Sequence, residues 1–88
     1  MPVDVDLLRR AFDNPGGLRF SEACKLAIQL GWVRARTVGS HVIFQHPGGM
    51  LLREKFPRPL NLQRGRNGMA KEYQVRQMLD MAAEMGII

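Results

Sequence analysis

The stretch LGWVRARTVGSHVIFQH, residues 30–46, decides the fold of this 88-residue chain. Two segments in it, 32–37 and 41–46, contain many β-branched and aromatic residues. Along the first of them, small or β-branched side chains alternate with arginines. Gly39 and Ser40 separate these segments and are suited to a tight turn. The pattern therefore predicts two antiparallel strands joined as a hairpin.

Alternation also predicts the direction in which the side chains of the hairpin point. In the first strand Arg34 and Arg36 are two residues apart, so we expect both on one face of the strand. In the second strand Val42 and Phe44 are typical core residues, and this places His41 on the opposite face. We therefore expect His41 to lie on an open surface beside two arginines.

Helices are predicted before and after the hairpin. One begins near residues 20–22, where Ser21 can cap the helix and Glu22 suits the positive end of its dipole, and it ends before Gly31. A final helix ends at Gly86, and turn formers follow a short first helix. The apolar residues at helical spacing in these three helices are, in chain order, Val5, Leu8 and Phe12; Ala23, Leu26, Ala27 and Leu30; and Tyr73, Val75, Met78, Leu79, Ala82 and Met85.

The remaining segments complete an α+β pattern. Residues 60–63 alternate and predict a third strand, and residues 64–68 predict a basic turn. Residues 50–59 include prolines that exclude a central strand, so we expect an excursion there. The order helix, helix, three strands, helix predicts one domain over residues 1–88, with helices on one face of a three-stranded antiparallel sheet. The other face stays open to solvent.

The charge of the chain is positive and unevenly distributed. There are 13 Lys and Arg residues against 8 Asp and Glu, which gives a net charge of +5 and a sequence pI of about 10.4. Residues 34–76 hold nine of the basic residues and only two of the acidic ones. This favours a nucleic acid held at its phosphates, because the candidate stacking residues Trp32, Phe44 and Tyr73 all stand at positions that predict burial.

Several classes of site are excluded by composition. Cys24 is the only cysteine, so no internal disulfide can form, and no CxxC motif or Cys/His pair predicts a zinc site. The two histidines lack a third ligand at metal-site spacing, and we expect neither a metal nor a cofactor. Residues 1–12 carry four charged side chains, which predicts neither a signal peptide nor a membrane span and favours a cytoplasmic protein.

Two blocks of the sequence carry a resemblance to a known family. They contain Leu30-Gly31-Trp32-Val33, Gly39-Ser40-His41, Ile43-Phe44 and His46-Pro47, then Leu60-Asn61-Leu62-Gln63, Asn67-Gly68 and Tyr73-Gln74-Val75-Arg76-Gln77. They resemble the HicA family of mRNA interferase toxins, in which a G-S-H element opens the second strand. The resemblance covers residues 20–88 as a HicA-like core and leaves residues 1–19 as an N-terminal extension. It implies a fold like a double-stranded-RNA-binding domain, with an extra short N-terminal helix.

The resemblance also implies a function. The chain would be the toxin of a toxin–antitoxin pair, an endoribonuclease that cleaves mRNA without a metal and is silenced by a HicB-like antitoxin protein. His41 would be its catalytic general acid or base, which suffices in principle because RNA supplies its own nucleophile, the 2′-hydroxyl. The residues expected to contact RNA are Arg34, Arg36, Ser40, Arg64, Arg66 and Lys71.

The chain departs from the family pattern at two positions, and alternatives remain. Val42 stands where many relatives have a second histidine, and Glu72 stands where a helix-starting proline is common. A catalytically silent RNA-binding or antitoxin-binding module on the same fold is the main alternative, and a DNA-binding protein fits less well because no helix-turn-helix pair is recognisable. His46 is expected to be structural, and Ser40 to be a turn former rather than a nucleophile.

Overall fold

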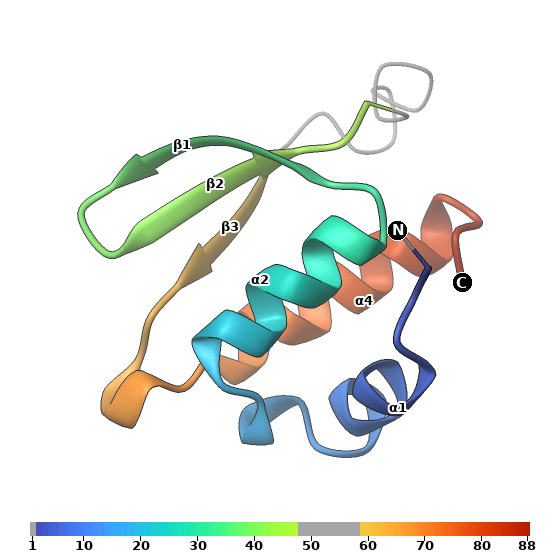
Figure 1. The fold of residues 1–88 in the computed structure, drawn as a ribbon, viewed down its shortest axis with the longest axis horizontal. Coiled ribbons are helices and arrows are strands. Elements are labelled where there is room, and N and C mark those ends of the chain that lie inside the picture. The colour runs from blue at the N-terminus through green and yellow to red at the C-terminus, as the bar shows by residue number, and fades with distance from the viewer. Residues whose placement is uncertain (1, 48–58) are drawn as a thin grey trace.

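A computed structural model describes residues 2–47 and 59–88 (Figure 1). Its elements are α1 (Val5–Asp13), η1 (Pro15–Gly17), α2 (Phe20–Gln29), β1 (Val33–Val38), β2 (His41–Gln45), β3 (Leu60–Gln63), η2 (Arg66–Gly68) and α4 (Glu72–Glu84). The predicted order of helix, helix, three strands and helix is confirmed. Apart from Pro59, the excursion predicted for residues 50–59 lies outside the described residues.

The three strands form one antiparallel sheet in the order β1-β2-β3. Gly39 has a φ of +60° at the turn between β1 and β2, a backbone conformation that side chains disfavour, so the predicted hairpin turn needs this glycine. In β3, Leu62 pairs with Val42 and Leu60 pairs with Phe44. Paired residues share a face of the sheet, and these four buried side chains therefore define its core face.

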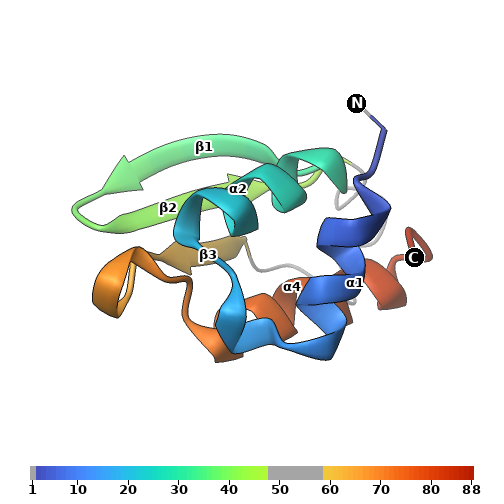
Figure 2. The same ribbon diagram turned by 60° about the horizontal axis from the view of Figure 1, so that its bottom comes forward.

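The helices all lie on the core side of the sheet. Figures 1 and 2 show α2 and α4 beside each other against that face, with α1 packed on the far side of them. Phe44 is completely buried in the single core cluster, to which all three helices contribute. No element among residues 2–47 and 59–88 covers the opposite face, and the predicted α+β arrangement with one open face is confirmed for this part of the chain. None of the helices described here is long and apolar enough to span a bilayer.

Helix α1 buries residues other than those that periodicity predicts. In α1 the buried residues are Leu7 and Ala11, whereas Val5 and Phe12 are more than half exposed. Leu7 and Ala11 are four residues apart on one face, and the small side chain of Ala11 lets the helix approach its neighbours closely. Helix α1 therefore packs on the core through the face of Leu7 and Ala11. The spacing of the larger residues Val5, Leu8 and Phe12 does not predict this face.

Two further predictions about helix ends and helix faces are wrong. Helix α2 starts at Phe20, within the predicted 20–22, but its N-cap residue is Arg19, and Ser21 lies exposed in the first turn. Glu22 accepts the Arg19 N–H at 2.9 Å. In α4, Tyr73 is 58% exposed and Gln74 is buried in its place. The Gln74 Oε1 atom accepts the backbone N–H of Gln63 at 2.7 Å, because β3 is an edge strand and that N–H needs a partner.

Candidate functional site

His41 stands at the start of β2, directly after the hairpin turn, and alternation with the buried Val42 and Phe44 places it on the face opposite the core. Its side chain is half-buried, and Nδ1 lies 3.2 Å from Oδ1 of Asn61 on β3. An amide oxygen only accepts hydrogen bonds, so Nδ1 donates to it, and in the neutral imidazole Nε2 then carries the lone pair. The placement of His41 on the open face agrees with the prediction, and the contact with Asn61 fixes the orientation of the ring.

Asn61 is a neighbour of His41 that sequence reasoning did not single out. It pairs with Ile43, while His41 pairs with Gln63, so Asn61 and His41 are diagonal neighbours on the open face. The alternation of residues 60–63 placed Asn61 on one face with Gln63. Only the register of β3 against β2 brings its amide next to the imidazole.

The open face holds little positive charge. Arg36 pairs with Ile43 and Val38 pairs with His41, and Val33 pairs with Gln45. Within the described ranges, Arg36 is the single cation that the strands place on this face. The described residues of the open face are Val33, Arg36, Val38, His41, Ile43, Gln45, Asn61 and Gln63.

The prediction that Arg34 and Arg36 share a face is wrong, because β1 contains a β-bulge. Arg34 pairs with Phe44, and Arg36 pairs with Ile43, which is adjacent to Phe44 in β2. Ala35 is therefore an extra residue without a partner. Phe44 belongs to the core face and Ile43 to the open face. The bulge therefore turns Arg34 toward the helices and leaves Arg36 on the side of His41.

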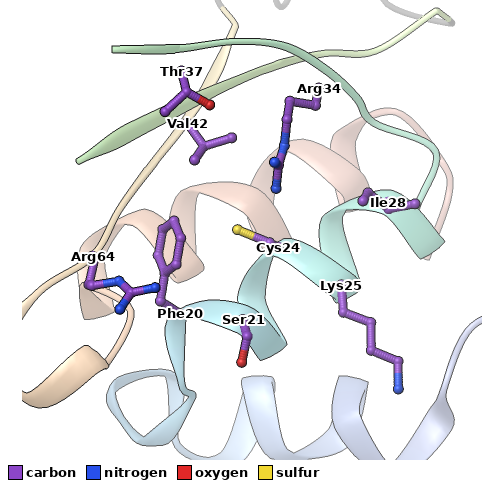
Figure 3. Close-up of a pocket in the computed structure, with 9 residues that line it drawn as sticks. All are labelled: Phe20, Ser21, Cys24, Lys25, Ile28, Arg34, Thr37, Val42 and Arg64. Carbon is purple, nitrogen blue, oxygen red and sulfur yellow. The ribbon is translucent and has the colours of Figure 1, made fainter. Parts of the chain in front are cut away.

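A second charged region lies where Arg34 points, in a groove of about 560 Å³ between α2 and β1. Figure 3 shows the Arg34 side chain reaching from β1 toward Cys24 on α2, with Arg64 beside the ring of Phe20. The guanidinium carbon of Arg64 lies 5.3 Å from the centre of that ring, a cation–π contact. Lys25 also lines this α2–β1 groove. Three of the cations therefore gather on the helix side of the sheet.

The thiol of Cys24 lies inside this groove and is 6% exposed. Burial raises the pKa of the Cys24 thiol, while a hydrogen bond and the positive charge from Arg34, together with the charge of Arg64, oppose that increase. The positive charges of Arg34 and Arg64 therefore stabilise a negative charge in the groove, and the pKa of the Cys24 thiol is sensitive to them.

The other predicted contact residues are placed separately. Ser40 Oγ accepts a hydrogen bond from the Gln63 side chain at 3.2 Å, and the Ser40 carbonyl accepts the Arg64 N–H at 3.3 Å, which fits a turn-forming role. Arg66 lies exposed in η2, and Lys71 lies just before α4. Neither of these two lines the α2–β1 groove or belongs to the sheet.

His46 packs in the structure rather than facing a site. Its Nε2 lies 3.0 Å from the carbonyl oxygen of Leu30, and its ring meets that of Trp32 edge-on at 5.1 Å between centres. A Cβ at Gly31 would come within 2.6 Å of His46 Nε2, so the glycine is needed both for its φ of +102° and for this close approach. The expected structural role of His46 agrees with these contacts.

A search of residues 2–47 and 59–88 finds no group of three or more His, Cys, Asp or Glu side chains placed to hold a metal ion. His41 and His46 lie on different faces of β2 and its continuation, since His46 contacts the core residue Trp32.

Comparison with known proteins gives one match. A model of the family described as the HicA toxin of bacterial toxin–antitoxin systems matches residues 20–61, which include α2, the whole hairpin and the start of β3. This match supports assignment of the chain to the HicA toxin family. The matched segment contains His41, Asn61 and both arginines of β1, and the α+β fold is consistent with the double-stranded-RNA-binding-domain-like fold of HicA. No curated protein and no solved structure matches the chain.

Proposed function

We propose that this HicA-family toxin is a metal-independent endoribonuclease that cleaves mRNA, with His41 as its general acid or base. The observation that carries the proposal is the hydrogen bond between His41 Nδ1 and Asn61 Oδ1 on the open face of the sheet. It holds the ring in one orientation and leaves Nε2 with a lone pair, as proton transfer requires. Histidine is the side chain whose ordinary titration range suits both directions of that transfer near neutral pH.

The reaction can be written with the groups on this face. The 2′-hydroxyl of one nucleotide attacks the adjacent phosphorus and transfers its proton to Nε2 of His41. The P–O2′ bond forms as the P–O5′ bond breaks, and the leaving O5′ takes a proton from water; the imidazolium later returns its own proton to water. The products are a 2′,3′-cyclic phosphate end and a 5′-hydroxyl end. Arg36, on the same face, is the candidate for stabilising charge at the phosphate.

A HicB-like antitoxin is the proposed protein partner, because membership in this family implies a toxin–antitoxin pair. To silence the enzyme as proposed, the antitoxin has to cover His41 or exclude RNA from the cations. The proposed RNA contacts beyond His41 are the predicted set, Arg34, Arg36, Ser40, Arg64, Arg66 and Lys71.

A catalytically silent RNA-binding or antitoxin-binding module is the second candidate. One observation favours it: Arg36 is the single cation that the described strands present on the face of His41, while Arg34 and Arg64 lie in the α2–β1 groove. A lone imidazole with one neighbouring arginine offers less charge stabilisation than a site with several cations.

Replacing the imidazole separates the two candidates. His41→Ala should lower the rate of RNA cleavage by about 10²- to 10⁴-fold and abolish growth arrest on expression, while circular dichroism and thermal unfolding show a folded protein. Gln45→Ala is the matched control, since Gln45 is an exposed residue of the same strand and face. A folded His41→Ala protein that cleaves RNA at the parental rate would falsify the catalytic role.

Chelation tests the absence of a metal in the mechanism. Cleavage by the unmodified chain should proceed at the same rate after dialysis against a strong chelator, because proton transfer by His41 needs no Lewis acid. Loss of cleavage in chelator with recovery on adding one divalent ion would contradict the proposal.

A further inference from the structure

The α2–β1 groove concentrates positive charge from three separate elements. Lys25 comes from α2, Arg34 from β1, and Arg64 follows β3. The residues that line the groove are Phe20, Ser21, Cys24, Lys25, Ile28, Arg34, Thr37, Val42 and Arg64, with no carboxylate among them (Figure 3). Three cations therefore line one cavity without a carboxylate in the lining.

The acidic residue nearest in sequence to Lys25 forms its ion pair with an arginine outside the groove. Glu22 of α2 forms an ion pair with Arg10 of α1 at 2.9 Å and accepts the Arg19 N–H. The only other ion pair within residues 2–47 and 59–88 joins Arg76 to Glu72 on α4. Across the described ranges, no carboxylate forms an ion pair with Lys25, Arg34 or Arg64.

The two arginines are held in place although no carboxylate pairs with them. Arg64 stacks on the Phe20 ring, and Arg34, directed inward by the bulge at Ala35, reaches toward Cys24 (Figure 3). Positioned cations lose less side-chain entropy on binding an anion than freely moving ones do. Three like charges around one open groove also repel each other, and an anionic ligand relieves that repulsion.

The groove ends close to the strand that carries His41. Thr37, one of its lining residues, pairs with Val42, the neighbour of His41 in sequence. The backbone N–H of Arg64 donates to the carbonyl of Ser40, the residue before His41, at 3.3 Å. A strand lying in the groove therefore leads to the tip of the hairpin, from which the open face and His41 begin.

We propose that the α2–β1 groove binds the phosphodiester backbone of single-stranded RNA, with Lys25, Arg34 and Arg64 as its phosphate contacts. This inference rests on the proposed ribonuclease function and gives the path by which the substrate reaches His41. A guanidinium group can donate two parallel hydrogen bonds to the oxygens of one phosphate. A groove that leads toward the reactive side chain also suits a polymer with a repeating phosphate backbone. Lys25 is a contact that the sequence did not indicate, and Arg36 is assigned to the catalytic face instead.

The test measures the affinity of a single-stranded RNA oligonucleotide in a His41→Ala background, so that bound RNA is not cleaved. Lys25→Ala, Arg34→Ala and Arg64→Ala should each weaken binding by about tenfold, the loss of one charge-assisted contact. Each should also lower the slope of log affinity against log salt by about 0.7. Arg9→Ala is the control, because Arg9 is exposed on α1 and lies outside the groove.

Lys25 keeps the test valid if an arginine variant folds poorly, since it is exposed and no described hydrogen bond or ion pair involves its side chain. Cys24 supplies a readout without any groove mutation. It is the only cysteine of the chain, so a small thiol reagent labels the groove alone. Saturating RNA should slow that labelling by about tenfold, in keeping with occupation of most sites.

The outcomes separate the groove from the nuclease proposal. If the groove variants bind RNA less tightly but the unmodified chain never cleaves RNA, the groove stands and the nuclease fails. If the unmodified chain cleaves RNA while all three groove variants keep the parental affinity and salt slope and Cys24 is not protected, the groove is overturned. Unchanged RNA affinity together with lost binding of a HicB-like antitoxin would assign the groove to acidic side chains of a protein, which also overturns it.

Discussion

The open face of the sheet and the α2–β1 groove differ in the side chains that they present: the first has a histidine, and the second has more of the cations. The open face has an oriented imidazole, His41, and one described cation, Arg36. The groove has three cations and a buried thiol, with no histidine in its lining. We therefore propose proton transfer on one side of the hairpin and phosphate binding on the other.

A single extra residue produces this division. In a regular strand Arg34 and Arg36 would face the same way, whereas the bulge at Ala35 sends one to each side. Bulges commonly redirect a side chain at the edge of a sheet. The comparison shows that charge counted along a basic strand does not give the charge on either of its faces.

Steady-state kinetics should show the division most strongly. His41→Ala should lower kcat by about 10²- to 10⁴-fold, because it removes a group that acts in the transition state. Arg34→Ala should raise KM by about tenfold and leave kcat nearly unchanged, because it removes uniform binding. If Arg34→Ala instead lowers kcat as much as His41→Ala does, the two regions act as one site and the comparison fails.

Asn61 tests whether the open face needs an oriented ring. Asn61→Ala removes the acceptor from His41 Nδ1, and we expect kcat to fall by about tenfold with little change in KM, the effect of one lost hydrogen bond in a positioning residue. Asn61→Asp keeps an acceptor oxygen at the same place and should retain more activity than the alanine variant. Equal activity of the parent and Asn61→Ala would show that the ring is held by other contacts.

Much of the fold follows from the sequence because its signals are local. The hairpin needs only two β-rich segments and a glycine turn, and Trp32 and Phe44 are buried as their positions predict. His41 is on the open face because alternation in β2 is regular over its five residues. The family resemblance rests on the same segment, and the family model matches it.

The parts that the sequence did not predict depend on contacts between distant segments. The bulge has no signature in VRARTV, since only the pairing of β1 with β2 shows that Ala35 lacks a partner. Gln74 replaces Tyr73 inside because the free N–H of Gln63 on an edge strand needs an acceptor. The α2–β1 groove brings residues 20–28 together with Arg34, Thr37, Val42 and Arg64, and neither periodicity nor charge counting predicts this contact.

Deletion of Ala35 tests the bulge directly. Because Ala35 has no partner in β2, its removal should make β1 regular, keep Arg34 toward Cys24 and Arg36 toward Ile43, and change Tm by no more than about 4–8 °C, the shift expected for about 1 kcal/mol. RNA affinity should stay near the parental value. In a strand without a bulge the same deletion would move every residue on one side of it to the opposite face and would strongly destabilise the hairpin.

The smallest expected effect is on the pKa of the Cys24 thiol, and it distinguishes the two arginines of β1 without RNA. Burial raises that pKa, and the hydrogen bond and charge of Arg34 oppose the increase. Removal of Arg34 leaves the thiolate with less stabilisation, so Arg34→Ala should raise the pKa further and move the pH dependence of thiol alkylation to higher pH. Arg36→Ala should leave the profile in place, because Arg36 lies on the opposite face of the sheet. Alkylation rates measured across the pH range on the single cysteine give both profiles. An equal shift for both variants would mean that Arg36 also acts on the groove, and the separation of the two faces would then be wrong.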